Sequence, residues 1–264
     1  ETNATLTFAD ANATLHDGNY SVVVSNDFGA VPSTMATFTV VDSSLGSGLV
    51  GWWRFDETNS SIAHDSSGND NNGTLTDFGS NTAPWVTGKI GGALSFDGNN
   101  DQVLLPNAAH PMGAELTVAF WANGGSSLPK QTTLLESELN GNRVINIHFP
   151  SDDGTIYWDV GPGGEHADRI QKTPVESDYK NLWAHWAFTK NVTTGIMEMH
   201  RNGSLWQSGT GKTLPLPSSQ VTSFRIGAFR TGAAHFWHGK LDDLRIYDRV
   251  LTESEIQTLY DLGQ

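Results

Sequence analysis

Gly239-Lys-Leu-Asp-Asp-Leu-Arg-Ile-Tyr247 has the pattern of a strand that closes a β-sandwich. Leu244 and Ile246 recur at every second position, which is the period of a strand with one buried face. Asp242 falls in phase with them, and a carboxylate on a buried face is costly unless it is paired, hydrogen-bonded or bound to a metal. The sequence therefore predicts a specific partner for Asp242.

A short helix is expected directly after this strand. Thr252-Glu-Ser-Glu255 has the spacing of a capping box, in which the threonine and the second glutamate each accept the other's backbone N–H. Residues 256–260 continue with an amphipathic pattern, and Gly263 can end the helix. The strand and the helix together form the C-terminal unit of the predicted fold.

Five segments in a fixed order resemble the laminin-G-like, concanavalin A-like jelly-roll family. The last is the strand and helix just described. The other four are Gly48-Leu-Val-Gly-Trp-Trp-Arg-Phe-Asp-Glu57, His64-Asp-Ser-Ser-Gly-Asn-Asp-Asn-Asn-Gly-Thr-Leu75, Gly88-Lys-Ile-Gly-Gly-Ala-Leu-Ser-Phe-Asp-Gly98, and Leu116-Thr-Val-Ala-Phe-Trp121 with Trp183-Ala-His-Trp-Ala-Phe-Thr189. The resemblance implies an all-β protein, a concanavalin A-like jelly-roll β-sandwich with a short C-terminal helix. It implies much less about function, because one fold hosts many functions.

The N-terminal part predicts a different domain. Residues 1–42 contain strand patterns at 4–8, 20–25 and 35–41, separated by Asn- and Gly-containing turns. Tyr20 resembles the tyrosine corner of immunoglobulin-like domains, although Val22 stands where antibody domains have cysteine. We therefore expect 1–42 to be the C-terminal part of an immunoglobulin-like domain of bacterial type, 43–48 a linker, and 49–264 the jelly roll. The open alternative is an N-terminal extension of the jelly-roll domain.

Composition excludes several classes of partner. The chain has 264 residues, with 29 acidic against 15 basic side chains and a net charge of −14, which argues against nucleic acid and anionic membranes as partners. It has no cysteine, so a disulfide framework, a zinc–thiolate site and a cysteine nucleophile are excluded. No run of about 18 apolar residues predicts a membrane span. We expect a secreted or cell-surface protein in which this chain is covalently linked to neighbouring domains.

The resemblance also implies a calcium site. It places the turn after Phe96 against the closing strand, which would bring Asp97 and Asn100 close to Asp242. Calcium prefers carboxylate, amide and main-chain oxygens. We expect a structural Ca²⁺ ion bound by Asp97, Asn100, Asp242 and main-chain oxygens of Gly98 or of the N-terminal strand, with Asp101 and Asp243 as substitutes. The open alternative is that these carboxylates only accept backbone hydrogen bonds.

Strand parity predicts a polar face suited to a sugar. If Ile145 and Trp158 point inward, their alternate neighbours point outward, and the same reasoning applies to the strands at 183–190 and 195–201. Planar hydrogen-bonding groups and aromatic rings on such a face suit sugar hydroxyls. The predicted ligand-binding residues are Asn146, His148, Tyr157, Asp159, His185, Glu198, His200 and Trp237, with Tyr157 and Trp237 as stacking rings. The open alternative is that a loop such as 234–238 covers this face.

The sequence gives little support for catalysis. Glu136-Ser-Glu138 could place two carboxylates on one face, as a retaining glycosidase requires, but it does not match the longer signature of such hydrolases on this fold. No nucleophile elbow, phosphate loop or His-Glu-x-x-His motif occurs. We therefore expect no enzyme but a module that recognises a polysaccharide or other glycan. The alternatives are a protein-binding adhesion or scaffolding module and, further away, a glycoside hydrolase or polysaccharide lyase.

Overall fold

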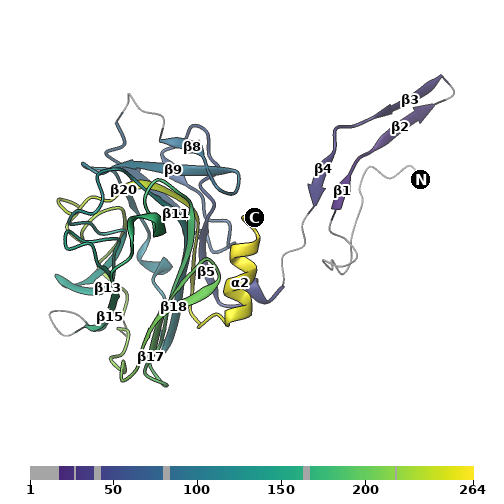
Figure 1. Cartoon of the computed structure of the whole chain (residues 1–264). Coiled ribbons are helices and arrows are strands. Elements are labelled where there is room, and N and C mark those ends of the chain that lie inside the picture. Colours follow the sequence, from purple (N-terminus) through teal and green to yellow (C-terminus); the bar gives the residue numbers. More distant parts are fainter. Residues whose placement is uncertain (1–17, 27, 39–42, 80–83, 163–166, 218) are drawn as a thin grey trace. The chain divides into compact units, whose positions relative to one another are not determined.

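The computed structural model describes residues 18–26, 28–38, 43–79, 84–162, 167–217 and 219–264 (Figure 1). The chain divides into two compact units, Glu1–Ser47 and Gly48–Gln264. The boundary falls inside the range 43–48, where Ser43–Gly46 forms a 3₁₀ helix. In the described part, no helix is long and apolar enough to cross a membrane.

The first unit contains two short antiparallel strand pairs in its described residues. Strands β1 (Gly18–Tyr20) and β4 (Ala36–Phe38) form one pair, and β2 (Val23–Asn26) and β3 (Gly29–Pro32) form the other. The strand predicted at 4–8 and the end of the strand predicted at 35–41 lie outside the described residues. The immunoglobulin-like assignment of this unit therefore stays a prediction.

The second unit is a sandwich of two antiparallel sheets, and β20 lies inside one of them (Figure 1). We call this sheet the β20 sheet; β20 pairs with β11, β9 and β5, so the strand predicted to close the sandwich does so. Its strands are β5 (Leu49–Trp53), β8 (Trp85–Thr87), β9 (Gly92–Asp97), β11 (Glu115–Gly124), β16 (Ala184–Asn191), β17 (Ile196–Arg201), β18 (Ser204–Gly209) and β20 (His238–Tyr247).

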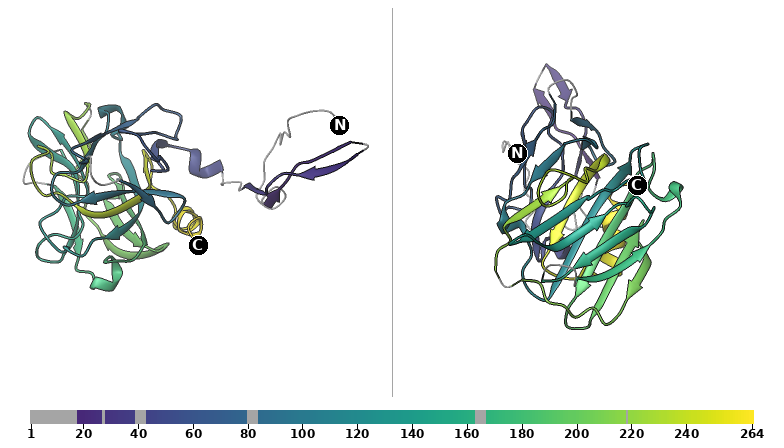
Figure 2. Two further views of the ribbon diagram at one scale, coloured as in Figure 1. Left: turned by 90° about the horizontal axis from the view of Figure 1, so that it is seen from above. Right: turned by 90° about the vertical axis from the view of Figure 1, so that its left-hand side faces the viewer.

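The other sheet, which we call the β13 sheet, carries the pocket described below. In the described residues its order is β15-β14-β13-β12-β19-β10-β7-β6. Its strands are β6 (Ile62–Ala63), β7 (Gly73–Thr76), β10 (Gln102–Leu104), β12 (Leu135–Leu139), β13 (Asn142–His148), β14 (Ile156–Val160), β15 (Asp168–Lys172) and β19 (Ser223–Ile226). Figure 2 shows the strands of the second unit from two further sides.

The core lies between the two sheets and confirms most of the predicted inward positions. Ile145 and Trp158 from the β13 sheet and Trp186 and Ile246 from the β20 sheet are all fully buried in one apolar cluster. Each such side chain contributes about 1.5–3 kcal/mol on transfer from water. The all-β jelly roll expected from the sequence is therefore the fold of this unit.

The C-terminal helix α2 (Glu253–Asp261) covers the outer face of the β20 sheet (Figure 1). The predicted capping box is present, because Thr252 Oγ1 accepts the Glu255 N–H and the Glu255 carboxylate accepts the Thr252 N–H. Tyr260 of α2 stacks on Trp121 of β11, with ring centroids 5.7 Å apart. The helix therefore buries side chains that a bare sheet face would expose.

Candidate functional site

Asp242 is fully buried, but not on the face that parity predicts. Leu241 and Leu244 both point into the core, and Asp243 between them has a φ of 50°, so β20 contains an irregular extra residue there. The matching register shift lies between Ala119 and Trp121 of β11. Asp242 consequently lies opposite Trp121, on the outer face of the sheet.

The partners of Asp242 are backbone amides. Its Oδ2 accepts the N–H groups of Lys89 and Ile90, each at 2.7 Å, and its Oδ1 has no partner among the described residues. Gly88 approaches so closely that a Cβ there would lie 2.6 Å from Oδ2. Burial raises the pKa of Asp242 to about 7, even though these two hydrogen bonds act in the opposite direction. For Asp242, the partners that the structure describes are therefore backbone hydrogen-bond donors, as in the second alternative left open by the sequence.

The calcium ligand set predicted from the sequence is wrong. Asp97 lies opposite His238, four positions along β20 from Asp242, which is about 13 Å at the rise of a strand. The Asp97 carboxylate accepts the Asn99 N–H at 2.8 Å, and the Gly98 carbonyl accepts Lys130 Nζ at 2.5 Å. The predicted ligands Asp97, Gly98, Asn100 and Asp242 are therefore not brought together.

The substitute ligands are also engaged elsewhere. Asp101 accepts the backbone N–H of Asp97 at 2.7 Å, and burial raises its pKa to about 6. Asp243 pairs with Arg245 at 3.2 Å. Among the described residues, no group of three or more His, Cys, Asp or Glu side chains could hold a metal ion.

The predicted sugar-binding face is divided between two sheets. Asn146, His148, Tyr157 and Asp159 lie on β13 and β14 of the β13 sheet, whereas His185, Glu198 and His200 lie on β16 and β17 of the β20 sheet. Each neighbouring pair of strands was predicted correctly, but the chain crosses to the other sheet between β15 and β16. The prediction of a single face is therefore wrong.

The two histidines of the group on the β20 sheet are buried, whereas the Glu198 side chain is 28% exposed. His185 is almost fully buried, with its ring 5.4 Å from Trp121 and 6.5 Å from Tyr260 of α2. Burial lowers the pKa of His185 to about 3. His200 is also buried, and its Nε2 lies 3.1 Å from the Glu198 carboxylate.

Trp237 is a core residue and not a stacking surface for a sugar. It is fully buried, its Nε1 donates to the Phe149 carbonyl at 2.9 Å, and its ring meets Phe96 edge-on at 5.7 Å. The loop that contains it does approach the β13 sheet. His235 from that loop lies 6.5 Å from His148 between ring centroids, so the loop covers part of the face, as the alternative proposed.

A continuous row of polar side chains crosses the outer face of the β13 sheet. Its members are cross-strand partners, so the register alone places them side by side. Asn146 is fully buried within the row and donates Nδ2 to the Glu136 carboxylate at 2.9 Å. The row runs Arg225, Glu136, Asn146, Asp159, Arg169 over β19, β12, β13, β14 and β15.

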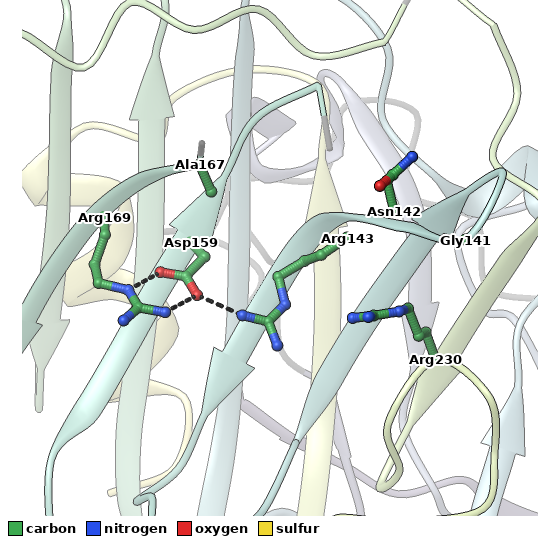
Figure 3. Close-up of a pocket in the computed structure, with 7 residues that line it drawn as sticks. All are labelled: Gly141, Asn142, Arg143, Asp159, Ala167, Arg169 and Arg230. Carbon is green, nitrogen blue, oxygen red and sulfur yellow. Dashed lines mark hydrogen bonds and ion pairs between the residues drawn. The ribbon is translucent and has the colours of Figure 1, made fainter. Parts of the chain in front are cut away.

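Three arginines hold the two buried carboxylates of this row. Figure 3 shows the bonds of Arg143 and Arg169 to one of them, Asp159. Asp159 accepts two hydrogen bonds from Arg169, at 2.6 and 2.7 Å, and one from Arg143 at 3.0 Å. Glu136 accepts one from Arg143 at 3.3 Å and one from Arg230 at 3.1 Å. Burial raises the pKa of Glu136, and the charges of Arg143 and Arg230 oppose that rise. These three arginines and two carboxylates form a network of charge-assisted hydrogen bonds, which we call the lattice.

A hollow of about 640 Å³ opens above this lattice. We call it the arginine pocket. It is lined by Gly141, Asn142, Arg143, Asp159, Ala167, Arg169 and Arg230 (Figure 3). Among the predicted site residues, Asp159 lines it directly. Tyr157 lies beside it, because the Arg169 guanidinium sits 4.5 Å above the Tyr157 ring.

His148 contacts Tyr157, the residue beside the arginine pocket. Its Nδ1–H donates to the Thr132 carbonyl at 2.5 Å, and its ring meets Tyr157 edge-on with centroids 6.0 Å apart. Burial lowers the pKa of His148 to about 4. His148 therefore packs against Tyr157 as a neutral ring, the Tyr157 hydroxyl donates to Asp153, and His148 is not among the residues that line the pocket.

Sequence reasoning missed Arg143, Arg169 and Arg230. Arg169 could have been found by extending the alternation of β14 to the strand that follows it. Arg143 could not, because a register shift between Ser137 and Glu138 changes the parity of β13, so that Val144 joins the core and Arg143 reaches the outer face. Arg230 comes from the segment after β19 and has no strand pattern.

The two sheets, their strand order and the terminal helix define a concanavalin A-like jelly roll. A family model described as the concanavalin A-like lectin/glucanases superfamily matches residues 97–257, and the chain belongs to this family. A comparison with curated protein sequences found no significant match.

Solved structures with a similar fold include carbohydrate complexes. Domain 4 of AbnA, an extracellular family GH43 arabinanase from Geobacillus stearothermophilus, in complex with arabinotriose, has a TM-score of 0.64 and 24% identity over 83% of this chain and 99% of that domain. The ligand-binding domain of botulinum neurotoxin serotype D in complex with N-acetylneuraminic acid has a TM-score of 0.62 and 18% identity over 83% of this chain. This chain spans about half of that toxin domain, 52% of its length.

Proposed function

We propose that this chain is a non-catalytic carbohydrate-recognition module of an extracellular protein, and that it binds its glycan in the arginine pocket. The observation that carries the proposal is the pocket itself, an open polar hollow whose guanidinium, carboxylate and amide groups are held in fixed positions by the lattice beneath it. Planar groups of this kind match the paired hydroxyls of a sugar ring. Preformed positions also reduce the entropy lost on binding.

The state of the two carboxylates supports binding over catalysis. A glycosidase needs one carboxyl group that donates a proton and a second that acts as nucleophile or base. Asp159 and Glu136 each accept hydrogen bonds from two arginines, so their oxygens are already occupied by donors of the protein. Glu138 is turned away, because it accepts the Gly141 N–H at 2.6 Å. The pair Glu136 and Glu138 is thus not arranged as a catalytic dyad.

The comparisons support the same assignment at the level of fold. The similar structures named above include one domain of an extracellular enzyme and one toxin domain, each with a bound sugar. We extend from them the expectation that this module is extracellular and that it keeps a linked partner domain close to a polysaccharide. The pocket chemistry, and not the fold, supports this choice of binding surface.

A glycan array followed by titration calorimetry tests this proposal. Replacing Asn142 and Tyr157 together with alanine removes a pocket side chain and the ring beside it, and we expect at least a tenfold weaker affinity for any glycan that the array identifies. Arg54→Ala is the control, because Arg54 is exposed and its contacts with Asp56 and the Trp52 ring lie outside the pocket. The affinity of this variant should change less than twofold. Full affinity in the double variant, or no retained glycan at all, would contradict the proposal.

A further inference from the structure

The arginine pocket concentrates positive charge in a strongly acidic chain. Three of the chain's eight arginines line it, whereas acidic residues exceed basic ones by 29 to 15 in the whole sequence. Beneath and within it lie two carboxylates, Asp159 and Glu136. Three guanidinium groups against two carboxylates leave a formal charge of about +1, because arginine stays protonated in proteins.

The arginines also keep hydrogen-bond donors free toward the hollow. Arg143 uses Nε and Nη1 for the two carboxylates, and Arg169 uses Nε and Nη2 for Asp159. Arg230 uses Nη1 alone for Glu136. Within the described residues, Nη2 of Arg143, Nη1 of Arg169 and Nη2 of Arg230 make no hydrogen bond. These are donors of the forked group that recognises carboxylate and sulfate oxygens.

Partial exposure separates these arginines from a purely structural one. Arg245 is 4% exposed and lies between the Asp243 carboxylate and the Trp52 ring, so no ligand can reach it. The side chains of Arg143, Arg230 and Arg169 are 18%, 25% and 44% exposed. Each therefore has one side bonded to the lattice and another open to the hollow.

We propose that the arginine pocket selects a glycan whose sugar carries a negative charge, either the carboxylate of a uronic acid or a sulfate ester, bound between the free donors of Arg143, Arg169 and Arg230. This inference rests on the proposed function and adds the charge of the ligand to it. With a neutral sugar bound, the surplus positive charge would not be neutralised and the free donors would bond only to water. An anionic group would neutralise the charge and accept from a fork at the same time.

Matched pairs of ligands test the charge requirement. Calorimetry of the full chain would compare polygalacturonate with its methyl ester, and dextran sulfate with dextran. The first pair tests the carboxylate source and the second the sulfate source. We expect at least tenfold tighter binding of the charged member in one pair. Equal affinity within both pairs would overturn the charge requirement.

Arginine variants locate the effect in the pocket. Arg230→Gln and Arg169→Gln keep a planar donor group and remove the charge, and their partial exposure limits the cost in stability. Each should weaken the charged ligand at least tenfold, while Arg54→Gln should change it less than twofold. Unchanged binding of the charged ligand by both pocket variants would overturn the inference. If a neutral glycan binds tightly and the Asn142→Ala, Tyr157→Ala double variant abolishes that binding, the charge requirement is overturned and the proposed function stays intact. If no glycan binds, both are overturned.

Discussion

At the scale of single residues, Asp242 makes the stability of the fold depend on pH. Its pKa is raised from an ordinary value near 3.8 to about 7 by burial, with the charges of Asp243 and Asp56 acting in the same direction. Between these two values the folded protein holds a proton that the unfolded chain has released. Its contribution to stability is therefore complete below about pH 4, falls as pH rises toward 7, and changes no further above that.

Asp242→Asn should remove this dependence, because the amide oxygen can still accept the Lys89 and Ile90 N–H groups while no charge is buried. The difference in free energy of unfolding between variant and wild type should be about 1 to 4 kcal/mol larger, in favour of the variant, at pH 8 than at pH 4.5. One pKa unit corresponds to about 1.4 kcal/mol. Urea unfolding at both pH values measures the gain. Asp248→Asn, at an exposed position, is the control, and a constant difference between variant and wild type would contradict the prediction.

His148 should act on stability in the opposite direction. Burial lowers its pKa from about 6.5 to about 4, so in that window the unfolded chain binds a proton that the folded protein does not. Stability is therefore lost as pH falls from 6.5 to 4. His148→Asn retains a donor for the Thr132 carbonyl and cannot be protonated, and its stability relative to wild type should rise as pH falls through this window. A melting series from pH 7 to 4 measures it; parallel curves for the two proteins would contradict the assignment.

At the scale of elements, the alternation of apolar residues predicted which side of each strand faces the core. Ile145, Trp158 and Ile246 are inside, as expected. Alternation could not show that β16 and β17 belong to the sheet opposite β13 and β14. Apolar residues recur at every second position in a strand of either sheet, so the pattern does not reveal where the chain crosses over. It also failed at Asp243 and at Val144, where an extra residue in the strand reverses the face to which the side chains beyond it point.

The terminal helix was predicted from its capping box, but its role as a cover for His185 was not. Tyr260→Ala would remove the ring that stacks on Trp121 and lies near His185. We expect a loss of about 1–3 kcal/mol in the free energy of unfolding, below the value for a fully buried aromatic residue because Tyr260 is only partly buried.

Water admitted by this change should also raise the pKa of His185 from about 3 toward its ordinary value. Urea unfolding measures the first effect and an NMR titration of His185 the second. Ser254→Ala, on the same helix and exposed, is the matched control. An unchanged His185 titration in the tyrosine variant would show that the helix is not what shields it.

At the scale of the whole molecule, every residue of the arginine pocket belongs to the second compact unit, Gly48–Gln264. A fragment of residues 48–264 should therefore fold and bind the same glycan within twofold of the affinity of the full chain. Circular dichroism and calorimetry on the fragment and on the full chain make the comparison. A fragment that folds but binds at least tenfold more weakly would place part of the site in residues 1–47.

The position of β20 has a consequence for biosynthesis. Strands β5 and β9 are synthesised early, but β20, with which both pair, is synthesised almost last. In the sheet, β20 also lies between these two strands and β11. While the ribosome is still adding the middle of the chain, these edges have no partner. The sandwich can close only after nearly all of it has been synthesised, so a nascent chain stalled before residue 238 would remain open and depend on chaperones.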